Sequence, residues 1–292
     1  MAEATLKQDA PSLYAGACVI LTTKHQKAAA ITPVFDKVLG AGILEYMSDT
    51  DKLGTFSGEV ERKGTALYCV RKKCEWGLKL KGVEYALASE GSFGPHPFIP
   101  FVPSNREILY FIDKKRDFHL YVTDIFMETN YQMGEFSSLD DLLAFADKAL
   151  FPSHGLIIRP FPRDVKSIVF KGIENKTDLE AAFHESMKAS KTGKIWAETD
   201  MRAHMNPSRM KVIGQLAEQL ANRLATQCRS CGVPGWGQVG REEGLPCEGC
   251  GMPSEMTLHE IYGCVKCAHK EKHPRKDGLR STSPSQCQWC NP

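Results

Sequence analysis

The chain has 292 residues, of which 42% are hydrophobic and 25% charged, and its formal net charge is +2. This composition is typical of a globular protein, and the small net charge gives no general reason to expect a polyanionic partner. No apolar run approaches the roughly 20 residues that a membrane helix needs. The opening sequence MAEATLKQDAPSLYAG has no apolar signal core. We therefore expect a cytoplasmic protein with no membrane partner.

The first third of the chain predicts an α/β sheet. Apolar runs of strand length occupy residues 16–23, 42–47 and 83–88. Segments with helical periodicity, residues 24–40 and 65–79, lie between them. This alternation favours parallel pairing of the strands. The third strand is expected to end at residue 88, because the next residues, SEGSFGPHP, are rich in glycine and proline.

The middle of the chain adds further strands and helices, and a well-signalled helix follows them. Asn206 is a good N-cap for that helix, and Pro207 suits its first position. We predict an α/β domain over residues 1–205 with a mixed sheet and flanking helices, a connecting amphipathic helix over 206–227, and a zinc-ribbon region over 228–292. The additional elements are strands at 106–113, 118–131, 155–161, 166–173 and 193–199, and helices at 137–150 and 176–190.

Cysteine usage is the strongest signal in the sequence. Eight of the eleven cysteines form four CxxC pairs near the C-terminal end: Cys228/Cys231, Cys247/Cys250, Cys264/Cys267 and Cys287/Cys290. The pairs are separated by fifteen, thirteen and nineteen residues. Such spacings are typical of cysteine knuckles that share a tetrahedral Zn²⁺ ion. The short middle gap favours two sequential ribbons, in which the first pair joins the second and the third joins the fourth.

The two predicted zinc ions are expected to be structural, because four cysteine ligands leave no coordination position open for water. An RNA-binding role is the competing interpretation, since residues 266–280 hold six basic side chains. The preceding ribbon is rich in glutamate, and with eight thiolates and two Zn²⁺ ions the net charge of residues 226–292 is about −3. The region is therefore dipolar and is not predicted to bind polyanions in general.

Three polar loops of the α/β domain carry a second possible chemistry. Thr22, Lys24 and Lys27 lie where the first strand meets the first helix, a position suited to an anion. Glu59 and Arg62 lie in the loop before the second helix, and Glu90 follows the third strand. Carboxylates and cations that meet at one sheet edge would suit Mg²⁺ and a polyphosphate. The alternative is that these charges are solvated loop residues.

This order of motifs resembles the inosine triphosphate pyrophosphatase-like superfamily over about the first 125 residues. The resemblance implies that Thr22 and Lys27 bind phosphates, that Glu59 or Glu61 holds a metal, and that Glu90 completes the site. Lys24 stands where that family has asparagine, and ASEGS replaces its acidic turn. The chain as a whole resembles a bacterial family of uncharacterised proteins with an α/β domain and a cysteine-rich tail.

A further polar cluster lies before the well-signalled helix. In an extended segment, Glu198, Asp200, Arg202 and His204 would share one face. These residues predict either a polar pocket that binds an anion or a buried ion-pair network, with Asp200 joined to Arg202 or Arg209, that fixes the helix to the sheet.

Two functional hypotheses follow from these observations. The first is a Mg²⁺-dependent hydrolase of a nucleotide or another phosphorylated small molecule. In it Glu59 and Glu90 hold the metal, while Lys24, Lys27 and Arg62 bind phosphate. The second is a non-enzymatic zinc-ribbon module that binds a protein or RNA partner. Fold class does not select between them.

Overall fold

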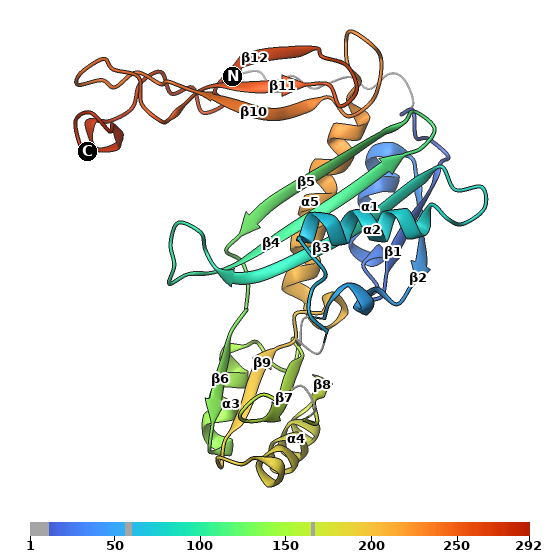
Figure 1. Cartoon of the computed structure of the whole chain (residues 1–292), viewed down its shortest axis with the longest axis vertical. Coiled ribbons are helices and arrows are strands. Elements are labelled where there is room, and N and C mark those ends of the chain that lie inside the picture. The colour runs from blue at the N-terminus through green and yellow to red at the C-terminus, as the bar shows by residue number, and fades with distance from the viewer. Residues whose placement is uncertain (1–11, 56–59, 165–166) are drawn as a thin grey trace. The chain divides into compact units, whose positions relative to one another are not determined.

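A computed structural model describes residues 12–55, 60–164 and 167–292 (Figure 1). The chain divides into two compact units, Met1–Ala221 and Asn222–Pro292. Within the described residues, no helix has the length and hydrophobicity needed to cross a bilayer.

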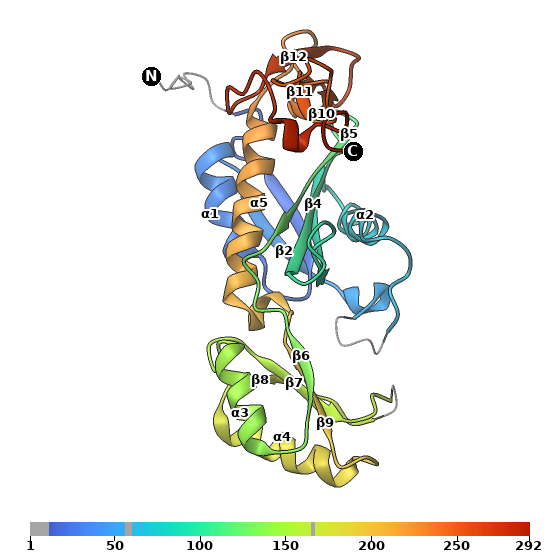
Figure 2. The ribbon, with the colours of Figure 1, turned by 90° about the vertical axis from the view of Figure 1, so that its left-hand side faces the viewer.

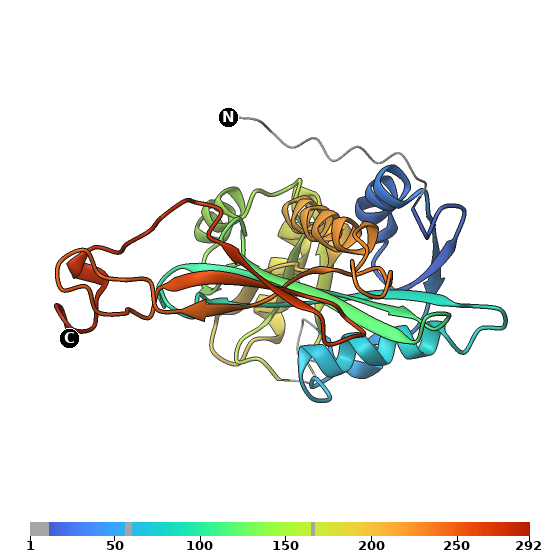
Figure 3. The ribbon, with the colours of Figure 1, turned by 90° about the horizontal axis from the view of Figure 1, so that it is seen from above.

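The first unit is built on a mixed five-stranded sheet with the strand order β2-β1-β3-β4-β5. Strand β1 is parallel to β2 and β3, and the other neighbours are antiparallel. The predicted mixed sheet is therefore confirmed. Helices α1 and α5 cover one face of the sheet, and α2 covers the other (Figures 2 and 3). The strands are β1 (Cys18–Thr23), β2 (Gly42–Met47), β3 (Tyr85–Pro95), β4 (Pro103–Asp113) and β5 (Phe118–Phe126).

The first two helices follow the apolar pattern of the sequence. Helix α1 (Ala28–Leu39) buries Ile31 and Phe35, and it ends at Gly40, whose φ of 63° is left-handed. Helix α2 (Ala66–Gly77) follows a short 3-10 turn, η1 (Thr50–Leu53). Its N-cap is Thr65, whose side chain accepts a hydrogen bond from the third residue along the chain.

Strand β3 does not end at residue 88, so that prediction is wrong. It continues to Pro95, and each of its residues from Tyr85 onward pairs with a residue of β4. The backbone hydrogen bonds of this ladder outweigh the turn preference of the local sequence. Gly91 does not form a turn after the strand but lies within the strand, beside a buried charged pair. A β-carbon there would lie 2.5 Å from both Arg209 Nη2 and Glu107 Oε1, so only glycine leaves room for this charged pair.

A second sheet, which the sequence pattern did not separate from the first, has the order β6-β9-β7-β8 and is antiparallel throughout. Helices α3 and α4 cover one of its faces (Figure 2). Ser138 and Asn175 cap these helices by accepting backbone hydrogen bonds. The elements are β6 (Met133–Phe136), α3 (Leu139–Lys148), β7 (Leu156–Pro160), β8 (Phe170–Ile173), α4 (Lys176–Ala189) and β9 (Ile195–Thr199).

Helix α5 (Pro207–Ala225) follows the 3-10 turn η2 (Ala203–Met205). Asn206 Oδ1 accepts a hydrogen bond from the Arg209 backbone N–H at 2.9 Å, which confirms the predicted N-cap. The buried face of the helix includes Ile213 and Leu216, as the periodicity indicated.

The second unit holds a three-stranded antiparallel sheet of β10 (Gly237–Glu243), β11 (Thr257–Gly263) and β12 (Lys270–Pro274), followed by η3 (Pro284–Gln286). All residues of this unit are described. Its buried hydrophobic side chains are three cysteines, one proline and two leucines, Leu224 and Leu245. So small an apolar core cannot by itself stabilise a domain of this size.

Candidate functional site

The eight paired cysteines form two clusters of four, and the ligand atoms within each lie within 4.8 Å of one another. One cluster joins the first and third CxxC pairs, Cys228, Cys231, Cys264 and Cys267. The other joins the second and fourth, Cys247, Cys250, Cys287 and Cys290. The pairing is therefore interleaved, and the prediction of sequential ribbons is wrong.

The antiparallel sheet explains this interleaving. Gly237 on β10 pairs with Gly263 on β11, so the third cysteine pair, which directly follows β11, lies beside the first pair, which precedes β10. The bridge between Pro246 and Pro253 closes the second knuckle, and the bridge between Cys247 and Thr282 brings the fourth knuckle beside it. Spacing along the chain did not reveal this, because strand pairing brings together cysteine pairs that are not neighbours in the sequence.

The sulfur geometry fits a tetrahedral metal ion. The Cys228–Cys267 and Cys231–Cys264 Sγ distances are 3.8 and 3.6 Å, and the corresponding distances in the other cluster are 3.9 and 3.8 Å. Four zinc–sulfur bonds of about 2.3 Å give tetrahedral edges of about 3.8 Å. A disulfide would need about 2.05 Å. Backbone N–H groups also donate to Cys247 and Cys264 Sγ, as is suitable for thiolates.

A cavity of about 280 Å³ lies in the first unit. Its acidic side chains are Asp51 and Glu90. Basic side chains outnumber them, since Lys24, Lys27, Lys73, Lys171 and Arg202 all line it. The structure thus brings together several residues that the sequence singled out, Thr22, Lys24, Lys27, Glu90 and Arg202, at one largely cationic site.

Lys27 is the most deeply buried of these cations, with 4% of its surface exposed. Its Nζ donates to Ser89 Oγ at 2.7 Å and to the Ser89 carbonyl oxygen at 3.3 Å. Burial lowers the pKa of Lys27 to about 7, and the nearby charges of Arg209 and Lys73 act in the same direction. The preceding residue, Gln26, has a φ of 53°, an uncommon left-handed conformation for a residue with a side chain.

The start of helix α1 is not an open anion site, contrary to the expectation from the sequence. The backbone N–H of Ala28 donates to Glu45 Oε1 at 2.9 Å, so a carboxylate of the protein already occupies the helix start. Lys24 lies at the edge of the cavity, where it pairs with Asp49 and Asp51. The hydrogen bond to Asp51 raises the pKa of Lys24, which keeps this lysine charged.

Glu90 is surrounded by cations. Lys73 Nζ lies 2.5 Å from one carboxylate oxygen and Arg62 Nη2 lies 3.0 Å from the other. Burial acts to raise the pKa of Glu90, but the charges of Lys73 and Lys27 outweigh it, so the pKa is lowered. Arg62 also donates to Ser92 Oγ at 2.8 Å. This environment holds Glu90 ionised and neutralised.

No magnesium site emerges around Glu90. Within residues 12–55, 60–164 and 167–292, the clusters of three or more possible metal ligands are the two cysteine sets. Both oxygens of Glu90 are already bonded to cations. Of the two other predicted metal ligands, Glu59 lies outside the described residues, so its role stays a prediction. Glu61 is exposed and does not line the cavity.

The cluster before helix α5 is divided between two environments. Asp200 is fully buried and pairs with Arg202 at 2.5 Å, as one of the two predictions for this cluster proposed. Glu198 instead accepts hydrogen bonds from Arg159 and Trp196, 3.1 and 3.0 Å away. The ring of His204 stacks on that of His25, with 5.1 Å between the ring centroids. Asp200 thus orients Arg202, which lines the cavity, while Glu198 faces other partners.

Three buried polar atoms at or beside the cavity have no hydrogen-bond partner among the described residues. They are Thr22 Oγ1, His25 Nδ1 and His204 Nδ1. Burial, together with the charge of Lys27, lowers the pKa of His25 to about 2, so this ring stays neutral. Unpaired buried polar atoms are rare in folded proteins, and a bound ligand or water commonly satisfies them.

Comparison with known proteins adds a family. A protein family with the description "Domain of unknown function (DUF6671)" matches residues 73–292. The chain belongs to this family. The match begins at Lys73 and includes both cysteine clusters, whereas the loop that holds Thr22 and Lys27 precedes it. No curated protein matches the chain. The resemblance to inosine triphosphate pyrophosphatases finds no support in these comparisons.

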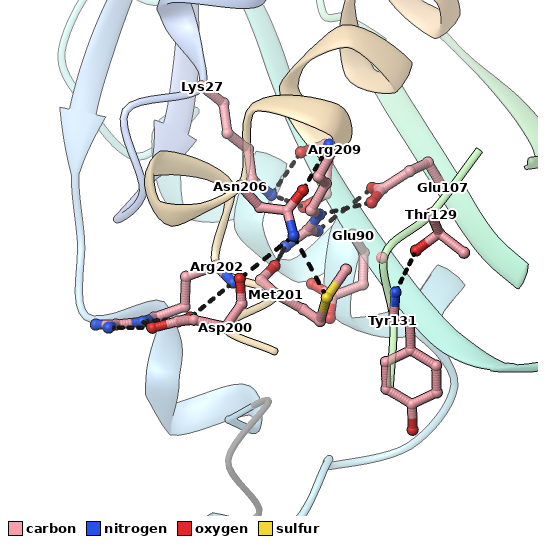
Figure 4. A network of polar contacts seen from close by, with 12 residues as sticks. Lys27, Glu90, Glu107, Thr129, Tyr131, Asp200, Met201, Arg202, Asn206 and Arg209 are labelled. Atoms are coloured by element: carbon pink, nitrogen blue, oxygen red, sulfur yellow. Dashed lines mark hydrogen bonds and ion pairs between the residues drawn. The ribbon is translucent and has the colours of Figure 1, made fainter. Parts of the chain in front are cut away.

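A buried polar network around Arg209 lies within the segment that matches DUF6671. The sequence named Arg209 as a possible partner of Asp200, but it did not predict Glu107, with which Arg209 pairs. Arg209 and Glu107 form a fully buried ion pair, with Nε and Oε1 2.7 Å apart (Figure 4). Arg209 also donates to the Met201 carbonyl oxygen, and Asn206 donates to Asn130 Oδ1 at 2.8 Å. The sequence did hold a signal for Arg209, because it occupies the apolar stripe of α5 together with Ile213 and Leu216.

Proposed function

We propose that the first unit binds a phosphorylated small molecule in the cationic cavity and that each cysteine cluster of the second unit holds a structural Zn²⁺ ion. The observation that carries the binding proposal is the buried Lys27 in a cavity whose lining has more cations than carboxylates. Lysine is a common phosphate ligand in proteins, where it acts as a point charge.

The pairing of the charges supports an anionic ligand. Asp51 is bonded to Lys24, and Glu90 is bonded to Lys73 and Arg62. The hydrogen bonds of Lys27 go to Ser89, which is neutral. A buried ammonium group without a direct counter-ion is costly, and a phosphate in the cavity would supply the missing negative charge.

The proposal is binding and not Mg²⁺-dependent hydrolysis. Mg²⁺ is usually held by one or two carboxylates together with substrate phosphates. Glu90 is the buried carboxylate of the cavity, and its oxygens face Lys73 and Arg62. A cation would have to displace these partners in order to bind there.

The cysteine clusters support zinc because four thiolates in a tetrahedron are the donor set that this metal prefers. The basic stretch of the second unit gives little support to RNA binding. Lys272 pairs with Glu242 at 2.6 Å, and Lys276 lies 3.8 Å from Glu260. Since these charges are balanced within the unit, we propose a structural role for it.

Isothermal titration of the full-length, metal-loaded protein with inorganic pyrophosphate, without Mg²⁺, tests the binding proposal. We expect saturable binding that Lys27→Met weakens by about 10- to 100-fold, the usual effect of losing a charged hydrogen bond. Lys79→Met is the matched control, because Lys79 is exposed and does not line the cavity. Absence of pyrophosphate binding, or equal affinity in the two variants, would refute the proposal.

A further inference from the structure

A second cavity, of about 310 Å³, adjoins the cationic one. Gly54, Thr55, Glu90 and Ile157 line both cavities, so the two share a wall. Ligand sites for drug-sized molecules commonly enclose roughly 300–1,000 Å³. Each cavity alone is at or below the small end of this range, whereas their combined volume lies within it.

The second cavity differs from the first in its chemistry. Two aromatic rings, Phe93 and Tyr131, line it with 5.8 Å between their centroids and a tilt of 32°. Apolar side chains of Met133, Ile157 and Met201 line it as well. The charged side chains that line it, Arg62, Glu90, Arg163 and Glu198, are balanced in sign. Its lining thus combines flat, apolar surfaces with balanced charges, whereas cations predominate in the first cavity.

The aromatic rings are held in place by the protein. The Arg209 guanidinium lies over the Phe93 ring, 5.2 Å from its centroid, and Arg209 is itself fixed by Glu107. The Tyr131 backbone N–H donates to Thr129 Oγ1 at 3.2 Å, and the ring extends away from the Arg209 network (Figure 4). Rings that are ordered before binding lose little entropy when a ligand stacks on them.

The shared wall contains a close backbone contact at Gly54. Gly54 has a φ of 132°, and a β-carbon there would lie 2.7 Å from Arg62 Cα. The backbone therefore approaches Arg62 as closely as glycine allows, and no side chain projects from this position. Glu90, which also faces both cavities, is neutralised by Lys73 and Arg62 and so does not strongly repel an anion.

We propose that the second cavity binds a planar ring of the same ligand whose phosphate lies in the cationic cavity, so that the ligand class is a nucleotide. This inference rests on the proposed phosphate binding. It assigns the two parts of the ligand to the two cavities: Lys27 and its neighbours bind the phosphate, and Phe93 and Tyr131 bind the base by stacking.

The test compares three probes on the full-length, metal-loaded protein by isothermal titration: pyrophosphate, adenosine diphosphate and uridine diphosphate. We expect at least one nucleotide to bind at least tenfold more tightly than pyrophosphate. Tyr131→Leu should remove this advantage and leave pyrophosphate affinity unchanged. Tyr121→Leu is the matched control, because Tyr121 lies on β5 outside both cavities. Lys27→Met should weaken all three probes.

The outcomes separate the two proposals. If pyrophosphate binds and neither nucleotide binds more tightly, the ring site is refuted and phosphate binding stands. If Tyr131→Leu weakens pyrophosphate and nucleotides equally, the ring site is likewise refuted. If no probe binds, both proposals fall. The comparison of probes on the unaltered protein needs no variant, so a folding defect in Tyr131→Leu leaves the test intact.

Discussion

The two units of this chain use buried polar groups for opposite purposes. The first unit has apolar cores on its two sheets, and it buries Lys27 and Glu90 in addition to them. The second unit has Leu224, Leu245 and Pro234 as its buried aliphatic side chains, and its other buried hydrophobic residues are cysteines. Buried charges that do not stabilise a fold are candidates for a functional role. Cysteines that take the place of an apolar core are instead candidates for a role in stabilising the fold.

Removal of the metal should produce the largest effect and should separate the two units most clearly. Structural zinc contributes on the order of 10 kcal/mol or more to small domains of this kind. With a high-affinity zinc chelator we expect residues 222–292 to lose hydrogen-exchange protection, while residues 12–221 keep theirs. Equal loss of protection in both units would show that the first unit also depends on the metal.

Double cysteine variants sharpen this prediction by testing the interleaving. Cys231→Ser with Cys264→Ser alters one cluster, whereas Cys231→Ser with Cys247→Ser alters both. Native mass spectrometry should therefore find one bound ion in the first variant and none in the second. Sequential ribbons would give the reverse result.

Breaking the buried Arg209–Glu107 pair should be the largest single-residue effect in the first unit. Arg209→Met leaves the Glu107 carboxylate buried without its counter-ion, which typically costs about 3–5 kcal/mol of unfolding free energy. Chemical denaturation of the first unit measures this. Arg71→Met, which removes an exposed ion pair on α2, should change stability by less than about 1 kcal/mol.

The pH dependence of the unfolding free energy tests whether the burial of Lys27 destabilises the folded protein. The pKa of Lys27 is about 7 in the folded protein, below the ordinary lysine value of 10.5, chiefly because of burial. Between these two pH values the unfolded chain binds more protons than the folded one, so stability should rise with pH across this window. The gain is on the order of a few kcal/mol, since each pKa unit corresponds to about 1.4 kcal/mol.

The matching variant for this measurement is Lys27→Met, which removes the titrating group. Denaturation of the two proteins from pH 7 to 10 should show a smaller rise in the variant. The charged groups that influence Lys27 are Arg209, Lys73, Glu107 and Glu90, and all are retained in the variant. If the unfolding free energy rises equally with pH in the two proteins, Lys27 is not desolvated in the folded state.

Loss of the α5 cap should be the smallest of these effects. Asn206→Ala removes the acceptor for the Arg209 backbone N–H and the donor to Asn130. We expect destabilisation of about 1–2 kcal/mol, measured as a shift in the thermal midpoint of the first unit. Asn222→Ala, at an exposed position of the same helix, is the control. No shift would mean that another group caps the helix.

Local signals predicted much of the fold. Periodicity located α1 and β1, and Asn206 with Pro207 fixed the start of α5. The sequence failed where pairing between distant segments decided the outcome. Residues 89–95 read as a turn but form a strand, because β4 pairs with them. The cysteine clusters were found, but their pairing depends on how β10 and β11 align.

The candidate site was predicted in part for a similar reason. Lys24 and Lys27 were found because they follow a strand in a polar loop, and they do line the cavity. Lys73 was not predicted to line the cavity, because it lies within a helix, where a basic residue normally faces solvent. Its place among the buried residues Val70 and Cys74 on α2 was the available signal. Glu107 lies within β4 and acquires its role from Arg209, 102 residues later.

Interleaving of the cysteine clusters has a consequence for the order in which the second unit can assemble during translation. Sequential ribbons would let the first ion bind as soon as Cys250 has left the ribosome. In the observed pairing, the first cluster waits for Cys267 and the second for Cys290. Until then the emerging thiols Cys228, Cys231, Cys247 and Cys250 are all present without a complete native ligand set. If these four bind a metal ion first, that ion must exchange ligands as the later cysteines arrive, because neither native cluster contains all four.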